Sequence, residues 1–265
     1  MRSTVLVAGI CGRMGVRVAE LIVDDAELDL VGGIERSDHP SAGSRIHVGG
    51  QEVTVYAGFR AEAAPANVLV DFTSAEGTQT AVEFCVRTLA SLVVGTTGHS
   101  EAGLESLKRA AKEIPLLLSP NMSVGVSLLS RVLPGLLDAV RGECEVEIVE
   151  KHHRWKKDSP SGTALKLADA LARSRPGEPP FRLAYGRDRG LSERDRGSLY
   201  VHSIRAGDVV GEHTVIIGLR GERIEIKHVV ESRDCFARGT VAAIKFLAGR
   251  PPGWYVMEDV VGPHS

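Results

Sequence analysis

The sequence has 265 residues and a formal net charge of −2 with its histidines neutral; 43% of the residues are hydrophobic and 25% are charged. A chain of this length and composition can bury one large core or two smaller ones. The near-neutral balance gives no overall basic field, so we expect neither nucleic acid nor a membrane surface as a partner. No apolar run approaches the length of a membrane span.

The four cysteines, Cys11, Cys85, Cys144 and Cys235, are scattered along the chain. They form no CxxC pair and no Cys/His spacing typical of zinc, so we expect free thiols and no metal. The first apolar run reaches its first glycine, Gly9, too soon for a signal peptide. These features predict a cytoplasmic protein.

The first half of the chain alternates short, almost continuous apolar runs with helical patterns. Five runs bounded by Gly, Pro, Asp or Ser predict buried strands at 4–8, 29–34, 67–72, 92–95 and 115–119. Helical patterns separate them, and in one of these Ser100 is a candidate N-cap with Glu101 in the first turn. Short connections between alternating strands and helices predict a doubly wound parallel α/β sheet.

The pattern changes near residue 123. A helical pattern at 124–140 contains Pro134, where we expect a bend. Runs at 145–150, 199–205, 214–219 and 223–229 predict strands, and a final apolar helix is expected at 239–247. Apolar and charged residues alternate in several of these runs, which is typical of an open antiparallel sheet with one wet face. The Arg/Gly-rich stretch 173–197 resembles a loop, and we predict two domains with a cleft between them.

Gly9, Gly12 and Gly15 follow the first predicted strand and open a helical pattern. Glycines at such a turn let backbone N–H groups approach a pyrophosphate, which lies at the positive end of the helix. The GxxGxxG spacing alone is weak, because a tight strand–helix turn needs glycine for structural reasons. Its position after the first strand favours dinucleotide binding.

Two charged residues, Glu35 and Arg36, end the second predicted strand. The carboxylate can accept hydrogen bonds from a ribose diol, whereas Arg36 and Arg13 could face a 2′-phosphate. Both could instead be ordinary loop charges, but they stand where the adenosine ribose should lie. Turns at 95–98 and 119–122 follow the fourth and fifth strands, so with the glycine loop they define one edge of the sheet, suited to the nicotinamide half.

The densest chemistry lies at 150–165, where two histidines and several cations come just before a predicted helix. Ser161 or Thr163 can cap that helix, whose N-terminus presents free N–H donors. Lys156 and His153 add full or titratable charge, so the segment suits a carboxylate.

Simpler interpretations compete with an anion site. A charged run is usually a solvated face, and paired histidines can bind a metal. However, neighbouring histidines on a strand point to opposite sides, no third ligand is evident, and Ser161 lacks the G-x-S-x-G context of a nucleophile. A solvated face does not explain why the cations gather at a helix start, so we favour the anion site.

Over nearly its whole length the chain resembles the 4-hydroxy-tetrahydrodipicolinate reductases, also called dihydrodipicolinate reductases, of the bacterial diaminopimelate–lysine pathway. The resemblance rests on Gly9–Gly15, Glu35-Arg36, Asp71–Thr73 with Glu76-Gly77, Gly95–Gly98, Asn121–Val126, His152-His153 with Lys156, Pro160–Ala164 and Arg205–His213. The HH…K…PSGTA element is the most specific of these.

The resemblance implies a Rossmann-like domain formed by residues 1–122 and 234–265. It implies a second, α+β domain over residues 123–233, with an open, mostly antiparallel sheet that binds substrate and forms the oligomer. It further implies a homotetramer and a small dicarboxylate substrate.

The resemblance also assigns residues. Those expected at the nucleotide are Gly9, Ile10, Cys11, Gly12, Arg13, Met14, Glu35, Arg36, Gly95, Thr96, Thr97, Ser119, Pro120, Asn121 and Met122. His152 would donate and accept a proton and Lys156 would donate one. Those expected at the substrate carboxylate are His153, Ser161, Gly162 and Thr163. Cys11 and Met122 depart from the family's usual small and aromatic residues.

The implied reaction is reduction of a cyclic, conjugated imine dicarboxylate by NADH or NADPH. The opposed charges of Glu35 and Arg36 predict use of both nucleotides. An aspartate-type amino-acid dehydrogenase and an NAD(P)-sensing regulator without turnover are the alternatives. The paired histidines and the anion site favour the reductase.

Overall fold

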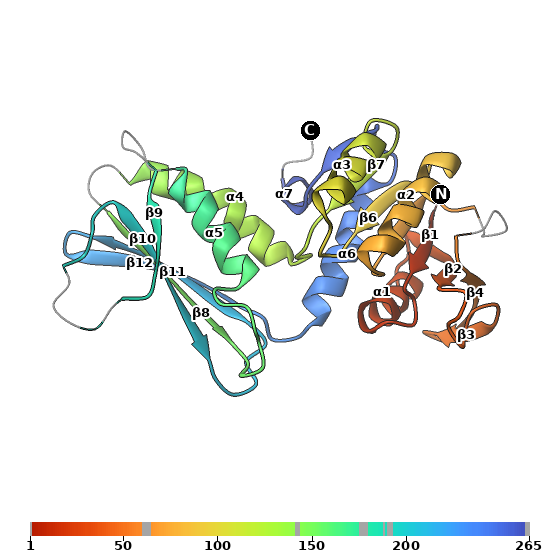
Figure 1. Cartoon of the computed structure of the whole chain (residues 1–265), viewed down its shortest axis with the longest axis horizontal. Helices are drawn as coiled ribbons and strands as arrows, with labels where there is room; N and C mark the ends of the chain where they lie inside the picture. The colour runs from red at the N-terminus through yellow and green to blue at the C-terminus, as the bar shows by residue number, and fades with distance from the viewer. Residues whose placement is uncertain are drawn as a thin grey trace. The chain divides into compact units, whose positions relative to one another are not determined.

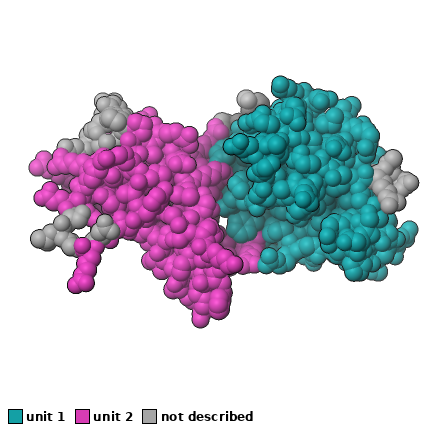
Figure 2. All heavy atoms as spheres, viewed as in Figure 1, with its two compact units in different colours: residues 1–124, 234–265 teal, residues 125–233 magenta. Residues whose placement is uncertain are grey.

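The computed structural model describes residues 2–59, 65–140, 144–174, 180–187, 189 and 193–262. The chain divides into two compact units, Met1–Val124 with Asp234–Ser265, and Gly125–Arg233 (Figure 2). The first unit therefore consists of two segments that are far apart in the sequence.

The first unit is built on an eight-stranded sheet of order β13-β7-β6-β5-β1-β2-β4-β3 (Figure 1). Its strands are β1 (Ser3–Ala8), β2 (Leu28–Glu35), β3 (Arg45–Val48), β4 (Gln51–Ala57), β5 (Val68–Asp71), β6 (Ser91–Val94), β7 (Pro115–Leu118) and β13 (Gly253–Tyr255). All neighbours pair in parallel except β3 and β4, which form an antiparallel hairpin. The predicted doubly wound parallel sheet is confirmed.

Helices cover both faces of this sheet. The apolar side chains of β1 point alternately to the two faces, so both faces must be covered. The helices are α1 (Arg13–Val23), α2 (Ala75–Thr88), α3 (Glu101–Ala110), α6 (Asp234–Leu247) and α7 (Met257–Val260). Val5 and Val7 belong to an apolar cluster with residues of α1 and α6, whereas Leu6 and Ala8 belong to a second cluster with residues of α2 and α3. As predicted, Ser100 caps α3, and its hydroxyl accepts the N–H of Gly103 at 3.2 Å.

The second unit has a five-stranded sheet of order β12-β11-β8-β10-β9. Its strands are β8 (Glu145–His152), β9 (Arg182–Tyr185), β10 (Ser198–Arg205), β11 (Glu212–Leu219) and β12 (Glu222–Val229). Strand β11 is antiparallel to β8 and β12, and β10 is parallel to β8 and β9. The antiparallel ladders are the longer ones, so the sheet is mostly antiparallel, as predicted.

The loop prediction for 173–197 is wrong at β9, a short strand held by its pairing with β10. Within that stretch, residues 175–179, 188 and 190–192 lie outside the described part of the chain.

Two helices, α4 (Val124–Ala139) and α5 (Gly162–Ala172), pack on the sheet of the second unit (Figure 1). Their apolar side chains, such as Leu133 of α4 and Leu167 of α5, share one cluster with Val146 and Val215 of the sheet. Pro134 lies inside α4, and the helix continues through it. No helix within the described ranges is long and apolar enough to cross a membrane.

Close packing of α6 generates a stability prediction. A Cβ atom on Gly239 would lie 1.7 Å from the carbonyl oxygen of Met122, whereas one on Gly135 of α4 would meet nothing within 4 Å. Gly239→Ala should lower the free energy of unfolding by about 2 kcal/mol or more, because backbone must move. Gly135→Ala should be neutral or stabilise by up to about 1 kcal/mol, since alanine favours helix. Urea unfolding measures the stability of both variants. Equal unfolding midpoints for the two variants would contradict the close approach of α6 to Met122.

Candidate active site

The glycine loop follows β1 at the point where the sheet order reverses, with β5 on one side of β1 and β2 on the other. The N–H of Gly9 donates to the carbonyl of Ile34 at 2.9 Å, which brings the loop beside the end of β2. Gly9 has a φ of +75°, and a Cβ on Gly15 would lie 2.0 Å from the Gly9 carbonyl oxygen. Side chains are therefore excluded at both positions, and the turn holds α1 close to the strand.

The N-terminus of α1 is prepared for an anion. Its N-cap, Gly12, offers no side-chain hydrogen bond, and the first turn contains no acidic residue. The first N–H groups of a helix have no partner within the helix and carry its partial positive charge. Arg13 and Met14, predicted to contact the nucleotide, stand in this first turn.

The carboxylate of Glu35 lies against the glycine loop. Its Oε1 accepts the N–H of Cys11 at 2.8 Å. Burial raises the pKa of the Cys11 thiol, and the charge of Glu35 adds to this rise while a hydrogen bond with Ser41 opposes it. Arg36 is exposed and lies 3.6 Å from Asp38, so its guanidinium is screened by water.

The turn after β6 packs against the segment that follows β5. Thr96 is buried, and its hydroxyl oxygen accepts the N–H of Thr73 at 3.0 Å. A Cβ on Gly95 would lie 2.1 Å from the ring of Phe72, so a larger residue is excluded there. Thr97, the third predicted residue of this turn, is exposed.

The turn after β7 is held by its own side chains. The hydroxyl of Ser119 donates to the carbonyl of Asn121 at 2.8 Å, and the Asn121 Oδ1 accepts the N–H of Ser123 at 2.8 Å. Pro120 is exposed between them. The side chain of Met122 is 3% exposed and belongs to the same apolar cluster as α1 and α6. The side chain of Met122 is therefore not available to a ligand.

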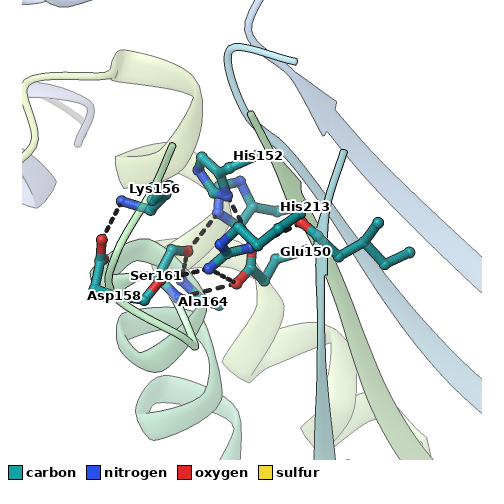
Figure 3. A network of polar contacts seen from close by, with 9 residues as sticks. Glu150, His152, Lys156, Asp158, Ser161, Ala164 and His213 are labelled. Carbon is teal, nitrogen blue, oxygen red and sulfur yellow. Dashed lines mark hydrogen bonds and ion pairs between the residues drawn. The ribbon is translucent and has the colours of Figure 1, made fainter. Parts of the chain in front are cut away.

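In the second unit, one face of the sheet changes from apolar to polar along three neighbouring strands. Alternate residues of each strand share this face. They run from Val146 and Ile148 to Glu150 and His152 on β8, from Ile217 and Val215 to His213 on β11, and from Leu199 and Val201 to Ser203 and Arg205 on β10. The polar ends meet beside the start of α5 (Figure 3).

Glu150 is the centre of this polar end, and its side chain is fully buried. Arg205 donates to both carboxylate oxygens, at 2.8 and 2.7 Å, and the N–H of Ser161 donates at 3.1 Å. Burial alone would raise the pKa of Glu150, but the hydrogen bonds from Arg205, His152, Ser203 and the Ser161 backbone outweigh it and lower the pKa to about 2. The carboxylate is therefore ionised at neutral pH.

The ionised Glu150 fixes the tautomer of His152. Its oxygen lies 2.6 Å from Nδ1 of His152 and cannot donate, so Nδ1 carries the proton. Burial lowers the pKa of His152, with smaller contributions from the charges of Lys156 and Arg205, although Glu150 opposes the change. The nitrogen left to exchange a proton is Nε2. Gly211 stands beside it, where a Cβ would come within 3.1 Å.

Ser161 is a structural link as well as a predicted substrate residue. It is the N-cap of α5, and its hydroxyl oxygen accepts the N–H of Ala164 at 3.2 Å. The same oxygen lies 3.1 Å from Nε2 of His213, to which its proton can be donated. Burial, with the charges of His152 and His228, lowers the pKa of His213 to about 4. The imidazole of His213 is thus neutral and able to accept.

Lys156, the predicted proton donor, and the remaining predicted substrate residues lie in the loop between β8 and α5 or at the start of α5. Lys156 Nζ lies 2.9 Å from Oδ1 of Asp158 (Figure 3). Gly162 is exposed and Thr163 is half-buried in the first turn of α5, and His153 is half-buried beside His152. The structure thus brings His152, Lys156, Ser161 and the start of α5 together in the second unit, and the glycine loop and Glu35 in the first.

Sequence reasoning assigned no role to three residues of this network: Glu150, Arg205 and His213. The spacing of Glu150 from His152 could have revealed the first, since residues two apart on a strand share a face. Arg205 and His213 approach only through strand pairing, in which Ser203 stands opposite Glu150 on β10 and His213 opposite it on β11.

Two protein-family models match this chain. The family model for the N-terminus of dihydrodipicolinate reductase matches residues 3–122, and the model for its C-terminus matches residues 125–261. The chain belongs to the dihydrodipicolinate reductase family. The C-terminal match includes α6 and β13, which lie in the first structural unit.

Named relatives agree with this family over the full chain. A 4-hydroxy-tetrahydrodipicolinate reductase of Alkalilimnicola ehrlichii is 41% identical, covering 99% of this chain and 100% of its own. The corresponding protein of Syntrophus aciditrophicus is 38% identical, covering 98% of each. A dihydrodipicolinate reductase of Paenisporosarcina sp. TG-14, solved with dipicolinate bound, has the same fold, with a TM-score of 0.78 at 22% identity over 98% of this chain and 99% of its own.

The buried, neutral His213 predicts a pH dependence of stability. Its pKa falls from 6.5 to about 4 on folding, so between these values the unfolded chain binds a proton that the folded chain does not. Stability should therefore fall as the pH falls through this window. Urea unfolding gives the free energy of unfolding at pH 7 and at pH 5. The decrease between these two values should be about 1–2 kcal/mol smaller in His213→Asn than in the wild type.

A matched substitution, His47→Asn on the exposed side of β3, controls for the loss of an imidazole. It should leave the difference between the two pH values unchanged. An undiminished difference in His213→Asn would mean that His213 is not buried in its neutral form.

Proposed function

We propose that this chain catalyses the NAD(P)H-dependent reduction of 4-hydroxy-tetrahydrodipicolinate to tetrahydrodipicolinate in lysine and diaminopimelate biosynthesis. Membership of the family over both halves of the chain supports the reaction. The observation that supports particular residues for this reaction is the His152–Glu150–Arg205 network beside Lys156 and the start of α5.

The first unit fits a nicotinamide dinucleotide. The uncapped first turn of α1 would hold the pyrophosphate, and Glu35 at the end of β2 would receive the ribose hydroxyls. The turns at 95–98 and 119–122 would line the nicotinamide. When bound, the cofactor supplies the hydride, and the protein supplies its orientation and charge.

The second unit fits a dicarboxylate. The N–H groups of Gly162 and Thr163 in the first turn of α5, together with His153, would hold a carboxylate. The dipicolinate bound to the Paenisporosarcina protein is a dicarboxylate, which agrees with such a site.

Proton transfer is the chemistry left to the side chains. The imine nitrogen gains electron density as the hydride arrives, so a positioned donor stabilises the transition state. Lys156 is the donor in this proposal, and Asp158 at 2.9 Å holds its ammonium group. His152 exchanges a proton through Nε2, because Glu150 keeps Nδ1 occupied.

The decisive experiment is oxidation of NADH on addition of the condensation product of pyruvate and aspartate semialdehyde. Lys156→Ala should lower kcat by about 10²-fold or more while NADH binding changes little, because a proton donor acts in the transition state. Lys157→Ala, which removes an exposed neighbouring cation, is the control and should keep kcat. If Lys156→Ala loses nucleotide affinity and keeps kcat, Lys156 is not the donor.

We further propose use of both nucleotides. Glu35 favours the 2′-hydroxyl of NADH and repels a 2′-phosphate, whereas Arg36 and Arg13 attract one. Because both arginines are exposed, their attraction is moderated by solvent, and the net preference should be small.

Charge changes at the end of β2 test this balance. Glu35→Lys should shift the ratio of kcat/KM values towards NADPH and Arg36→Ala towards NADH, each by about tenfold at fixed ionic strength. Glu52→Lys makes the same charge reversal on β4 and should leave the ratio unchanged. If neither substitution moves the ratio, the adenosine ribose does not lie beside Glu35.

The protein is expected to act as a cytoplasmic homotetramer without nucleic-acid or membrane partners. All four cysteines are free thiols, in keeping with a reducing compartment. Tyr185, Ile204 and Val229 are exposed on strands of the second unit, where further copies of the chain would cover apolar surface.

A further inference from the structure

Three side chains with metal-binding groups meet at the glycine loop. The Cys11 thiol, a carboxylate oxygen of Glu35 and a ring nitrogen of His39 all lie within 4.8 Å of one another, and each residue is half-buried. They come from three places in the sequence: the turn after β1, the end of β2, and the turn that follows β2.

Hydrogen bonds of the backbone hold this cluster in place. Cys11 N–H donates to Oε1 of Glu35 at 2.8 Å, which fixes the carboxylate against the loop. His39 N–H donates to the carbonyl of Arg36 at 2.9 Å, so the turn folds His39 back towards Glu35. Ser41 N–H donates to Nδ1 of His39 at 3.2 Å and orients the ring. The contacts of Cys11 and His39 hold the loop and the turn that carry the ligands, whereas the Ser41 contact must give way when a cation binds.

We propose that Cys11, Glu35 and His39 bind a soft divalent cation, with Zn²⁺ as the best match. A thiolate, an imidazole and a carboxylate with a fourth position for water form a tetrahedral set that suits Zn²⁺, and the thiolate disfavours Mg²⁺ and Ca²⁺. Tetrahedral zinc bonds place ligand atoms about 3.4–3.6 Å apart, so groups that now lie within 4.8 Å of one another need to close by at most about 1.3 Å.

The closure is feasible because the cluster includes a turn and half-buried side chains. It ends the contact between Ser41 N–H and His39, since Nδ1 must then hold either the cation or a proton. The loss of one neutral hydrogen bond is small beside the free energy of zinc binding. The sequence did not reveal this site because 24 residues separate Cys11 from Glu35, and only the parallel pairing of β1 and β2 unites them.

Occupation of the site should exclude the dinucleotide, a consequence that rests on the proposed function. A Glu35 carboxylate bound to a cation can no longer accept hydrogen bonds from a ribose, and the cation with its water would take the place beside Glu35 that the ribose needs. Zn²⁺ should therefore inhibit by competing with NADH rather than with the dicarboxylate.

Co²⁺ titration of the reduced full-length protein tests the site without nucleotide. Wild type should show the intense ultraviolet absorption of thiolate-to-cobalt charge transfer. Cys11→Ser should lose this absorption, and His39→Gln should weaken cation binding by about tenfold or more, since one of three protein ligands is gone. The controls Cys235→Ser and His47→Gln should bind as the wild type does. Circular dichroism establishes that each variant is folded.

Failure of the site and failure of the proposed function give different results. Absence of the charge-transfer absorption, or its persistence in Cys11→Ser, overturns the cation site whatever the enzyme reduces. Zn²⁺ should raise the apparent KM for NADH in the wild type at constant kcat and should do so less in His39→Gln. Co²⁺ binding that follows the expected pattern without such competition keeps the cation site and overturns the placement of the ribose at Glu35.

Discussion

The carboxylate of Glu150 is buried, and the geometry of the second unit depends on how its charge is satisfied. Removing an ionised carboxylate from water is costly unless its oxygens receive hydrogen bonds. Arg205 of β10, His152 of β8 and the backbone of Ser161 at the start of α5 supply them. The Glu150 carboxylate therefore fixes two strands and a helix relative to one another. Loss of Arg205 would leave a buried charge, which is far more damaging than loss of a surface ion pair.

The same physical arrangement appears in both units. In each unit, apolar residues fill the middle of a strand, and polar residues lie at its C-terminal end. β8 passes from Val146 and Ile148 to Glu150 and His152, and β2 ends at Glu35 after buried residues. A polar end can form there because the strand beneath it is already fixed by the core. The polar groups at these strand ends are thus held by packing that they do not provide themselves.

The limits of sequence reasoning follow from the distinction between local and non-local contacts. Apolar runs and periodicity predicted β1, β2, β5, β6, β7 and the cap of α3, because each depends on nearby residues. The hairpin of β3 and β4 is local, and its turn signal, Gly49-Gly50, was not used in the prediction. The short strand β9 depends on its pairing with β10 and was not predicted. For the same reason the histidines and Lys156 could be selected as candidate residues from sequence, whereas the partnership of Glu150 with Arg205 could not. It requires knowing that β10 lies parallel to β8.

The helix start that would receive the substrate depends on a neutral histidine. Ser161 accepts the N–H of Ala164 and directs its own proton to His213, so it satisfies α5 and the sheet together. Protonation of His213 would leave Nε2 unable to accept, and the hydroxyl would lose one of its two roles. Burial prevents this at neutral pH because it lowers the pKa of His213 to about 4. The burial that costs stability in acid therefore also keeps His213 able to accept a hydrogen bond from the Ser161 hydroxyl at neutral pH.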